Sequence, residues 1–76
     1  MPHVIIKMYS GRTEEQKARV AEEVTKAVMA TTGNTADAVS VSIEEFAPSE
    51  WTEKVYNPDI LGGKGTLYKK PGYQPS

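Results

Sequence analysis

The residue of greatest chemical interest in this sequence is Pro2, which directly follows Met1. If Met1 is removed, Pro2 carries a free secondary amine, and a chain-terminal amine has an ordinary pKa of about 8, against about 10.4 for lysine. Apolar surroundings and a nearby cation both disfavour the protonated amine and lower its pKa. A base whose pKa lies near the working pH suits general acid–base catalysis. The chain therefore begins with a candidate general base, provided that Met1 is removed, because the nitrogen is otherwise an amide.

Other catalytic groups are scarce among the 76 residues. The chain has no cysteine and a single histidine, His3, so neither a nucleophilic triad nor a thiolate metal site can be built. The run "LGGKGT" at 61–66 lacks the spacing and the following helix of a phosphate-binding loop. We therefore expect no metal site, and the amine of Pro2 remains the candidate reactive group.

Two predicted elements would position this amine. The run "HVIIKMY" at 3–9 is rich in β-branched residues and has apolar residues on both alternating faces, which is typical of a strand covered on both sides. Thr13 and Gln16 form a capping-box pattern that opens a helix of about twenty residues, and Gly33 and Asn34 end it. Its apolar stripe contains Val20, Ala21, Val24, Ala27, Val28 and Thr31.

The run "AVSVSIEEF" at 38–46 alternates with a period of two and predicts a second strand. Strand, helix and strand form a β-α-β unit, in which the two strands lie parallel. The segment 47–76 contains four of the five prolines and four of the six glycines, so we expect an irregular tail. The fold class is α/β, with one domain over 1–76, a core at about 2–46, and a tail that packs on the site or on a neighbouring subunit.

Length and charge limit the class of protein further. A chain of 76 residues without disulfides buries little surface by itself, and oligomerisation is the remaining common way to stabilise it. The formal net charge of −1 disfavours a protein dedicated to nucleic acid or to anionic membranes. No apolar run has the length of a membrane span or of a signal-peptide core. We expect a soluble, cytoplasmic, self-associating protein that binds neither nucleic acid nor membrane.

Residues 2–52 resemble the 4-oxalocrotonate tautomerase family. The resemblance rests on Pro2, on "GRTEEQK" at 11–17 opening the helix, and on the second strand "VSVSIEEF", while "LYKKPGY" at 67–73 is similar to the phenylpyruvate-tautomerase-like branch. It implies an amino-terminal proline that moves a proton between an enol and a keto acid, without cofactor or metal. It also implies a homodimer with one four-stranded sheet and both helices on one face, or a hexamer of three such dimers.

The resemblance also assigns three further site residues. Arg12 falls at the family's substrate-binding arginine, and its planar guanidinium can donate two hydrogen bonds to a carboxylate; by itself it would be interpreted as a solvated residue. Trp51 falls at an aromatic position beside the proline, although a single tryptophan is more often a packing residue. Ser40 departs from the family, because diacid-processing members have a second arginine there. A monocarboxylate enol with an aromatic or aliphatic tail therefore fits this sequence better than a dicarboxylate.

Three functions remain open from the sequence. The first is a cofactor-independent keto–enol tautomerase acting on a small enol carboxylate. The second is a related hydratase or dehalogenase of small unsaturated acids, for which Glu44, Glu45 and Glu50 are candidates by residue type only. The third is a non-catalytic oligomeric binding protein, in which the basic and aromatic run "GKGTLYKKPGY" contacts nucleic acid; the net charge disfavours it.

Overall fold

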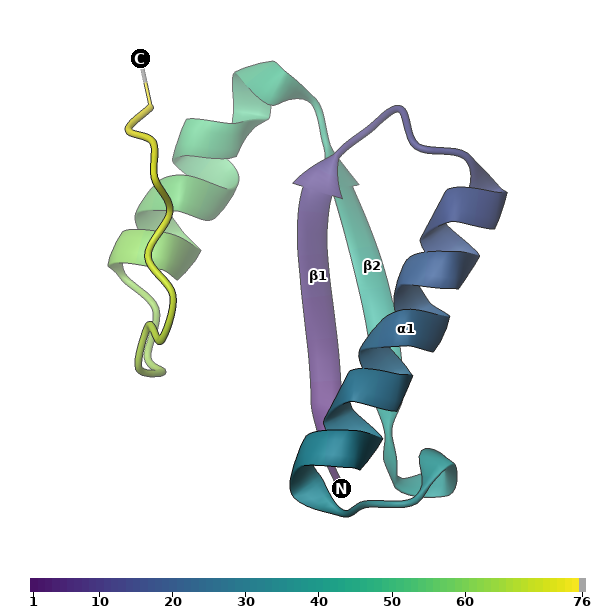
Figure 1. The fold of residues 1–76 in the computed structure, drawn as a ribbon. Coiled ribbons are helices and arrows are strands. Elements are labelled where there is room, and N and C mark those ends of the chain that lie inside the picture. The colour runs from purple at the N-terminus through teal and green to yellow at the C-terminus, as the bar shows by residue number, and fades with distance from the viewer. Residues whose placement is uncertain (76) are drawn as a thin grey trace.

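The computed structural model describes residues 1–75. Its elements follow in the order β1 (His3–Tyr9), α1 (Glu14–Thr32), η1 (Ala36–Ala38), β2 (Ser40–Phe46), η2 (Pro48–Glu50) and η3 (Thr52–Leu61). β1 and β2 pair in parallel, and α1 connects them (Figure 1). The predicted β-α-β unit is confirmed. The second strand begins at Ser40, slightly later than predicted, because η1 occupies the residues just before it.

The sheet has two different faces, because side chains alternate along each strand. The register aligns His3 with Ser40 at one end and Tyr9 with Phe46 at the other. One face carries Val4, Ile6, Met8, Val41, Ile43 and Glu45, and the other carries His3, Ile5, Lys7, Tyr9, Ser40, Ser42, Glu44 and Phe46. α1 covers the first face, where Lys17 Nζ lies 2.9 Å from Glu45 Oε2.

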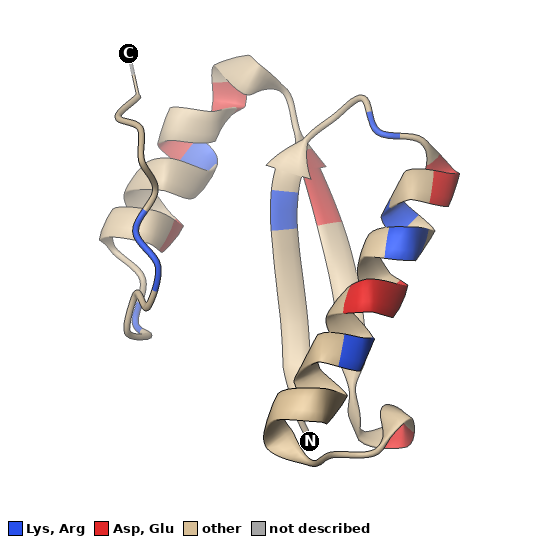
Figure 2. Ribbon diagram, in the orientation of Figure 1, with Lys and Arg blue, Asp and Glu red and all other residues tan. Residues whose placement is uncertain are grey.

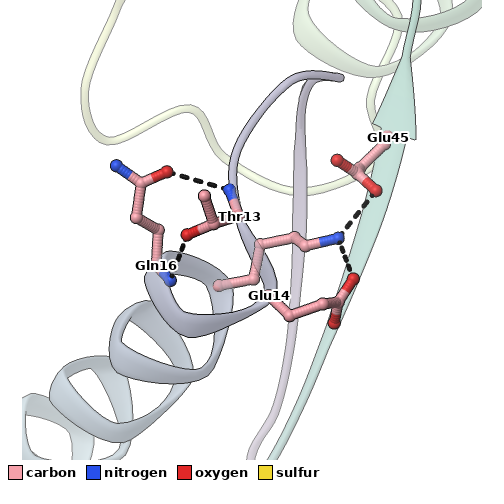
Figure 3. A network of polar contacts seen from close by, with 5 residues as sticks. Thr13, Glu14, Gln16 and Glu45 are labelled. Carbon is pink, nitrogen blue, oxygen red and sulfur yellow. Dashed lines mark hydrogen bonds and ion pairs between the residues drawn. The ribbon is translucent and has the colours of Figure 1, made fainter.

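The two ends of α1 form as the sequence predicts. Thr13 Oγ1 accepts a hydrogen bond of 3.0 Å from the backbone N–H of Gln16, and Gln16 Oε1 accepts one of 2.9 Å from the backbone N–H of Thr13 (Figure 3). Gly33 ends the helix with a φ of 77°, in the left-handed region that glycine adopts without a steric penalty. Lys17 also lies 2.8 Å from Glu14, so a single lysine joins the first turn of α1 to β2. The hydrogen bonds that Lys17 donates to Glu14 and then to Glu45 raise the pKa of Lys17.

The tail is not irregular throughout, because its residues Thr52–Leu61 form η3. η3 continues through Pro58, with the i→i+5 bonding of a π-helix, as in the 3.0 Å bond from Gly62 N–H to Asn57 O. A proline inside an α-helix meets the carbonyl four residues earlier, and the wider winding gives it more room. Val55 and Tyr56 are the buried residues of η3, so packing outweighs the breaking tendency of the proline.

η3 lies on the face of the sheet opposite α1 (Figure 1). Asp59 of η3 forms an ion pair with Lys7 of β1, and the hydrogen bond to Asp59 raises the pKa of Lys7. The chain is therefore layered as α1, sheet and η3, and both faces of β1 are at least partly covered, as its apolar pattern predicts. Residues 67–75 then run back beside η3.

The reversal after η3 depends on glycine. A Cβ on Gly63 would lie 2.3 Å from the backbone oxygen of Asp59, which is far inside contact distance. We expect Gly63→Ala to lower the free energy of unfolding by about 1–3 kcal/mol, measured by chemical denaturation. Gly65→Ala is the matched control, since a Cβ there meets no atom within 4 Å. Equal losses in the two variants would contradict this account of the turn.

A single chain leaves much apolar surface uncovered. Among residues 1–75, the buried apolar core consists of Val55 and Tyr56, which are 3% and 9% exposed, and no residue of α1 is buried. Ile5 of β1 is 55% exposed. Each strand also has one unpaired edge, and an isolated two-stranded sheet is marginally stable at best. The fold therefore has apolar faces and open edges that a second copy of the chain can cover.

Charged residues of both signs lie along α1 (Figure 2). Lys26 Nζ lies 3.3 Å from Glu22 and 3.5 Å from Glu23, on the solvated side of the helix. Within residues 1–75, no helix has the length and apolar composition needed to span a bilayer.

Candidate active site

Pro2 is fixed at the head of β1 by the neighbouring strand. Its carbonyl oxygen accepts a hydrogen bond of 3.2 Å from the backbone N–H of Ser40, and the residue is half-buried. Met1 precedes it with a 98% exposed side chain. The sheet thus holds residue 2 in one place, while the residue before it is open to solvent.

The structure brings Ser40 together with the proline end of the sheet. Ser40 Oγ lies 2.7 Å from His3 Nδ1, and both side chains point to the face opposite α1. A serine in this arrangement supplies a hydroxyl but no positive charge. The partner of Ser40 was not predicted, and only the alignment of the two strands brings it there.

Arg12 lies at the opposite end of β1, between Gly11, with a φ of 120°, and the cap of α1. It is exposed and lines an open groove of about 480 Å³ between α1 and β1. The same groove is lined by Met8, Gln16, Lys17, Arg19, Val20, Glu23 and Val24. Within residues 1–75 no carboxylate forms an ion pair with Arg12, which leaves its guanidinium available for a carboxylate ligand.

Trp51 is the centre of an aromatic cluster beyond the end of β2. Its ring meets Tyr9 at 5.2 Å and Phe46 at 6.3 Å, in both cases edge to face. Its indole N–H donates a hydrogen bond of 2.9 Å to Tyr73 Oη. Trp51 thus packs as a structural residue and also lines a cavity of about 290 Å³ together with Tyr9 and Tyr73.

The turn before Trp51 is closed by Glu50. Its carboxylate accepts a hydrogen bond of 3.0 Å from the backbone N–H of Ala47 and lies 2.6 Å from Lys54 Nζ. The Lys54 contact, followed by the Ala47 N–H, lowers the pKa of Glu50. Glu50 therefore joins the backbone at Ala47 to the first turn of η3 through Lys54.

The predicted site residues fall into two groups within one chain. Pro2 and Ser40 lie where the strands begin, and Arg12 and Trp51 lie where they end. Since β1 has seven residues, the two groups are roughly 20 Å apart. One chain does not bring the four residues together.

Among residues 1–75, no group of three acidic, histidine or cysteine side chains is placed to hold a metal ion.

Comparison with known proteins gives the class that this fold defines. A family model described as "Tautomerase enzyme" matches residues 2–54. A protein named "Probable tautomerase" from Xylella fastidiosa (strain 9a5c) is 37% identical over 73 residues, which cover 96% of this chain and 89% of that protein. These matches define a small β-α-β isomerase.

Two further relatives extend the comparison. The "2-hydroxymuconate tautomerase" of Bacillus subtilis (strain 168) is 51% identical over 46 residues, 60% of this chain and 74% of that protein. The crystal structure of YwhB, a homologue of 4-oxalocrotonate tautomerase, has 47% identity and a TM-score of 0.60, and the match covers 62% of this chain and 77% of that one. The chain belongs to the tautomerase family, and the predicted resemblance to 4-oxalocrotonate tautomerase is confirmed.

Proposed function

We propose that the protein is a cofactor-independent keto–enol tautomerase in which the free amine of Pro2 is the general base. The observation that carries the proposal is the fixed position of residue 2, held by the 3.2 Å bond from Ser40 N–H at the head of β1. The substrate is a small 2-hydroxy enoate or enol carboxylate. Pro2 accepts the proton of the enol hydroxyl, and the resulting ammonium delivers a proton to carbon as the C=C bond becomes the C=O bond. No electrons are lost, and the base is regenerated.

This role requires removal of Met1. With Met1 attached, the nitrogen of Pro2 is an amide and has no basic lone pair. The 98% exposure of Met1 supports its access to an aminopeptidase. Once free, the secondary amine has an ordinary pKa of about 8, which apolar neighbours and a nearby guanidinium lower further.

We infer that the complete site forms between subunits. Pro2 and Arg12 lie at opposite ends of β1, so neither can reach the substrate bound by the other within one chain. If the edges of two copies pair antiparallel, the start of one strand lies beside the end of its partner. A homodimer with a four-stranded sheet then places Arg12 and Trp51 of one chain near Pro2 of the other, and a hexamer of three dimers is the alternative assembly.

Ser40 supports a substrate with a single carboxylate. Its hydroxyl is engaged by His3 at 2.7 Å, and it brings no charge to the proline end. Arg12 then supplies the one guanidinium of the proposed site, and the aromatic cluster around Trp51 offers an apolar wall. An enol acid with an aromatic or aliphatic tail, such as phenylenolpyruvate, matches this arrangement better than a dicarboxylate such as 2-hydroxymuconate.

The hydratase or dehalogenase alternative needs a carboxylate that activates water. Two of the three candidate glutamates are already engaged: Glu45 lies 2.9 Å from Lys17 and Glu50 lies 2.6 Å from Lys54. The third, Glu44, shares a sheet face with Lys7, which itself pairs with Asp59. These contacts favour proton transfer between enol and keto forms over attack by water.

A substrate panel tests the proposal. We expect the purified protein, with loss of Met1 verified by intact mass, to accelerate ketonisation of phenylenolpyruvate measured by ultraviolet absorbance. We expect a smaller kcat/KM for 2-hydroxymuconate and no turnover of chlorinated or unsaturated acids that require water. Turnover of the unsaturated acids, without ketonisation of either enol, would contradict the tautomerase assignment.

A further inference from the structure

The end of the chain reaches back to the proposed substrate wall through one directional contact. Trp51 Nε1–H donates a hydrogen bond of 2.9 Å to the hydroxyl of Tyr73, which lies 22 residues later. The indole otherwise touches the rings of Tyr9 and Phe46, both edge to face. Residues 67–75, which we term the C-terminal strap, thus contribute the polar partner of the single tryptophan.

The hydrogen bond restricts a movement of the indole that the ring contacts leave free. Edge-to-face contacts at 5.2 Å and 6.3 Å set the tilt of the indole, but such contacts tolerate sliding in the ring plane. A hydrogen bond weakens steeply away from its preferred angle and distance. The Tyr73 hydroxyl therefore fixes the remaining freedom of the indole and, with it, the shape of the wall.

Tyr73 is itself held in place. Its ring packs at 5.8 Å against Tyr56, which is buried in η3. The chain turns back after η3, so that the strap runs beside this helix (Figure 1). The contact with Tyr56 thus ties the ring of Tyr73 to η3.

We propose that Tyr73 is a positioning residue, which sets the orientation of Trp51 and thereby the shape of the apolar wall against which the substrate tail packs. Tyr9, Trp51 and Tyr73 together line the cavity of about 290 Å³, so the strap forms one side of it. The effect on turnover rests on the proposed function, whereas the effect on the indole does not. We assign this role to the hydroxyl, because the hydroxyl accepts the hydrogen bond from the indole, whereas the ring of Tyr73 packs on Tyr56.

Tyr73→Phe tests the role, because it removes the hydroxyl and keeps the ring. Trp51 is the only tryptophan, so intrinsic fluorescence reports on this side chain alone. We expect stronger acrylamide quenching of Trp51, and a KM for phenylenolpyruvate raised roughly three- to tenfold with kcat nearly unchanged, the size of one neutral hydrogen bond. Tyr68→Phe is the matched control, because Tyr68 lies in the same strap and is 95% exposed. It should change neither quantity.

Two further comparisons separate positioning from a general loss of structure. In a Trp51→Phe background, Tyr73→Phe should leave KM unchanged, because the N–H donor is already absent. Unchanged quenching of Trp51 in Tyr73→Phe would overturn the proposal. Altered quenching with an unaltered KM would also overturn it, and so would effects of Tyr68→Phe equal to those of Tyr73→Phe. If the proposed function itself is wrong, the wild-type protein will have no ketonisation activity. The quenching measurement then still decides whether Tyr73 holds Trp51.

Discussion

Pro2→Ala is expected to lower kcat for ketonisation of phenylenolpyruvate by at least about 10²-fold, the size of a positioned general base. The variant retains an amine after removal of Met1, but this primary amine can rotate about its N–Cα bond, whereas the ring of Pro2 holds the secondary amine and its lone pair in one direction. The backbone contact is unaffected, because Ser40 N–H donates to the carbonyl oxygen of residue 2 whatever its side chain. The loss should therefore appear in turnover and leave the thermal unfolding midpoint nearly constant.

Two measurements accompany this variant. Intact mass must show that Met1 is removed from both proteins, since a retained methionine blocks the nitrogen in either case. The pH profile of wild-type kcat/KM should fall as the pH decreases through the pKa of the amine, because only the neutral amine accepts a proton. Wild-type turnover by a correctly processed Pro2→Ala protein would contradict the assignment of the base.

Arg12→Gln is expected to lower kcat/KM by about 10- to 100-fold, mainly through KM, because a charged hydrogen-bond donor to the substrate carboxylate is lost. The unfolding midpoint should change little, since Arg12 is exposed and forms no ion pair within residues 1–75. Arg12→Lys should recover only part of the loss, because an ammonium lacks the planar fork of the guanidinium. Lys64→Gln is the control, because Lys64 is an exposed cation that lies outside this groove.

The same variant shows whether the site is shared between chains. Pro2→Ala and Arg12→Gln each remove a residue from a different end of β1. When the two impaired proteins are unfolded and refolded together, mixed dimers contain one site with both residues intact, so activity should rise above that of either variant alone. Absence of recovery in verified mixed dimers would mean that Arg12 acts on the Pro2 of its own chain.

The elements that the sequence predicted well are those with strong local signals. The capping box of Thr13 and Gln16 and the left-handed Gly33 define α1 almost residue by residue. The alternating run from Ser40 to Phe46 defines β2. Parallel pairing then follows, because a helix of this length between two strands forms a crossover.

What the sequence did not predict depends on contacts between distant residues. η3 continues through Pro58 because Val55 and Tyr56 are buried, and a local breaking signal does not reveal that burial. The bond between Trp51 and Tyr73 spans 22 residues and carries no spacing signature. The sequence does indicate that Pro2 and Arg12 are far apart, since a strand of seven residues lies between them. That Pro2 and Ser40 share one end of the sheet follows only from the observed pairing of the strands.

The proline nitrogen itself provides the most direct test of the central claim. Ketonisation of phenylenolpyruvate should be compared between processed protein and a form with one lysine inserted between Met1 and Pro2, both verified by intact mass. The insertion leaves every side chain in place but turns the nitrogen of Pro2 into an amide. We predict full activity for the processed protein and loss of at least about 10²-fold for the extended form. Equal turnover by the two forms would contradict the proposal that the amine of Pro2 is the base.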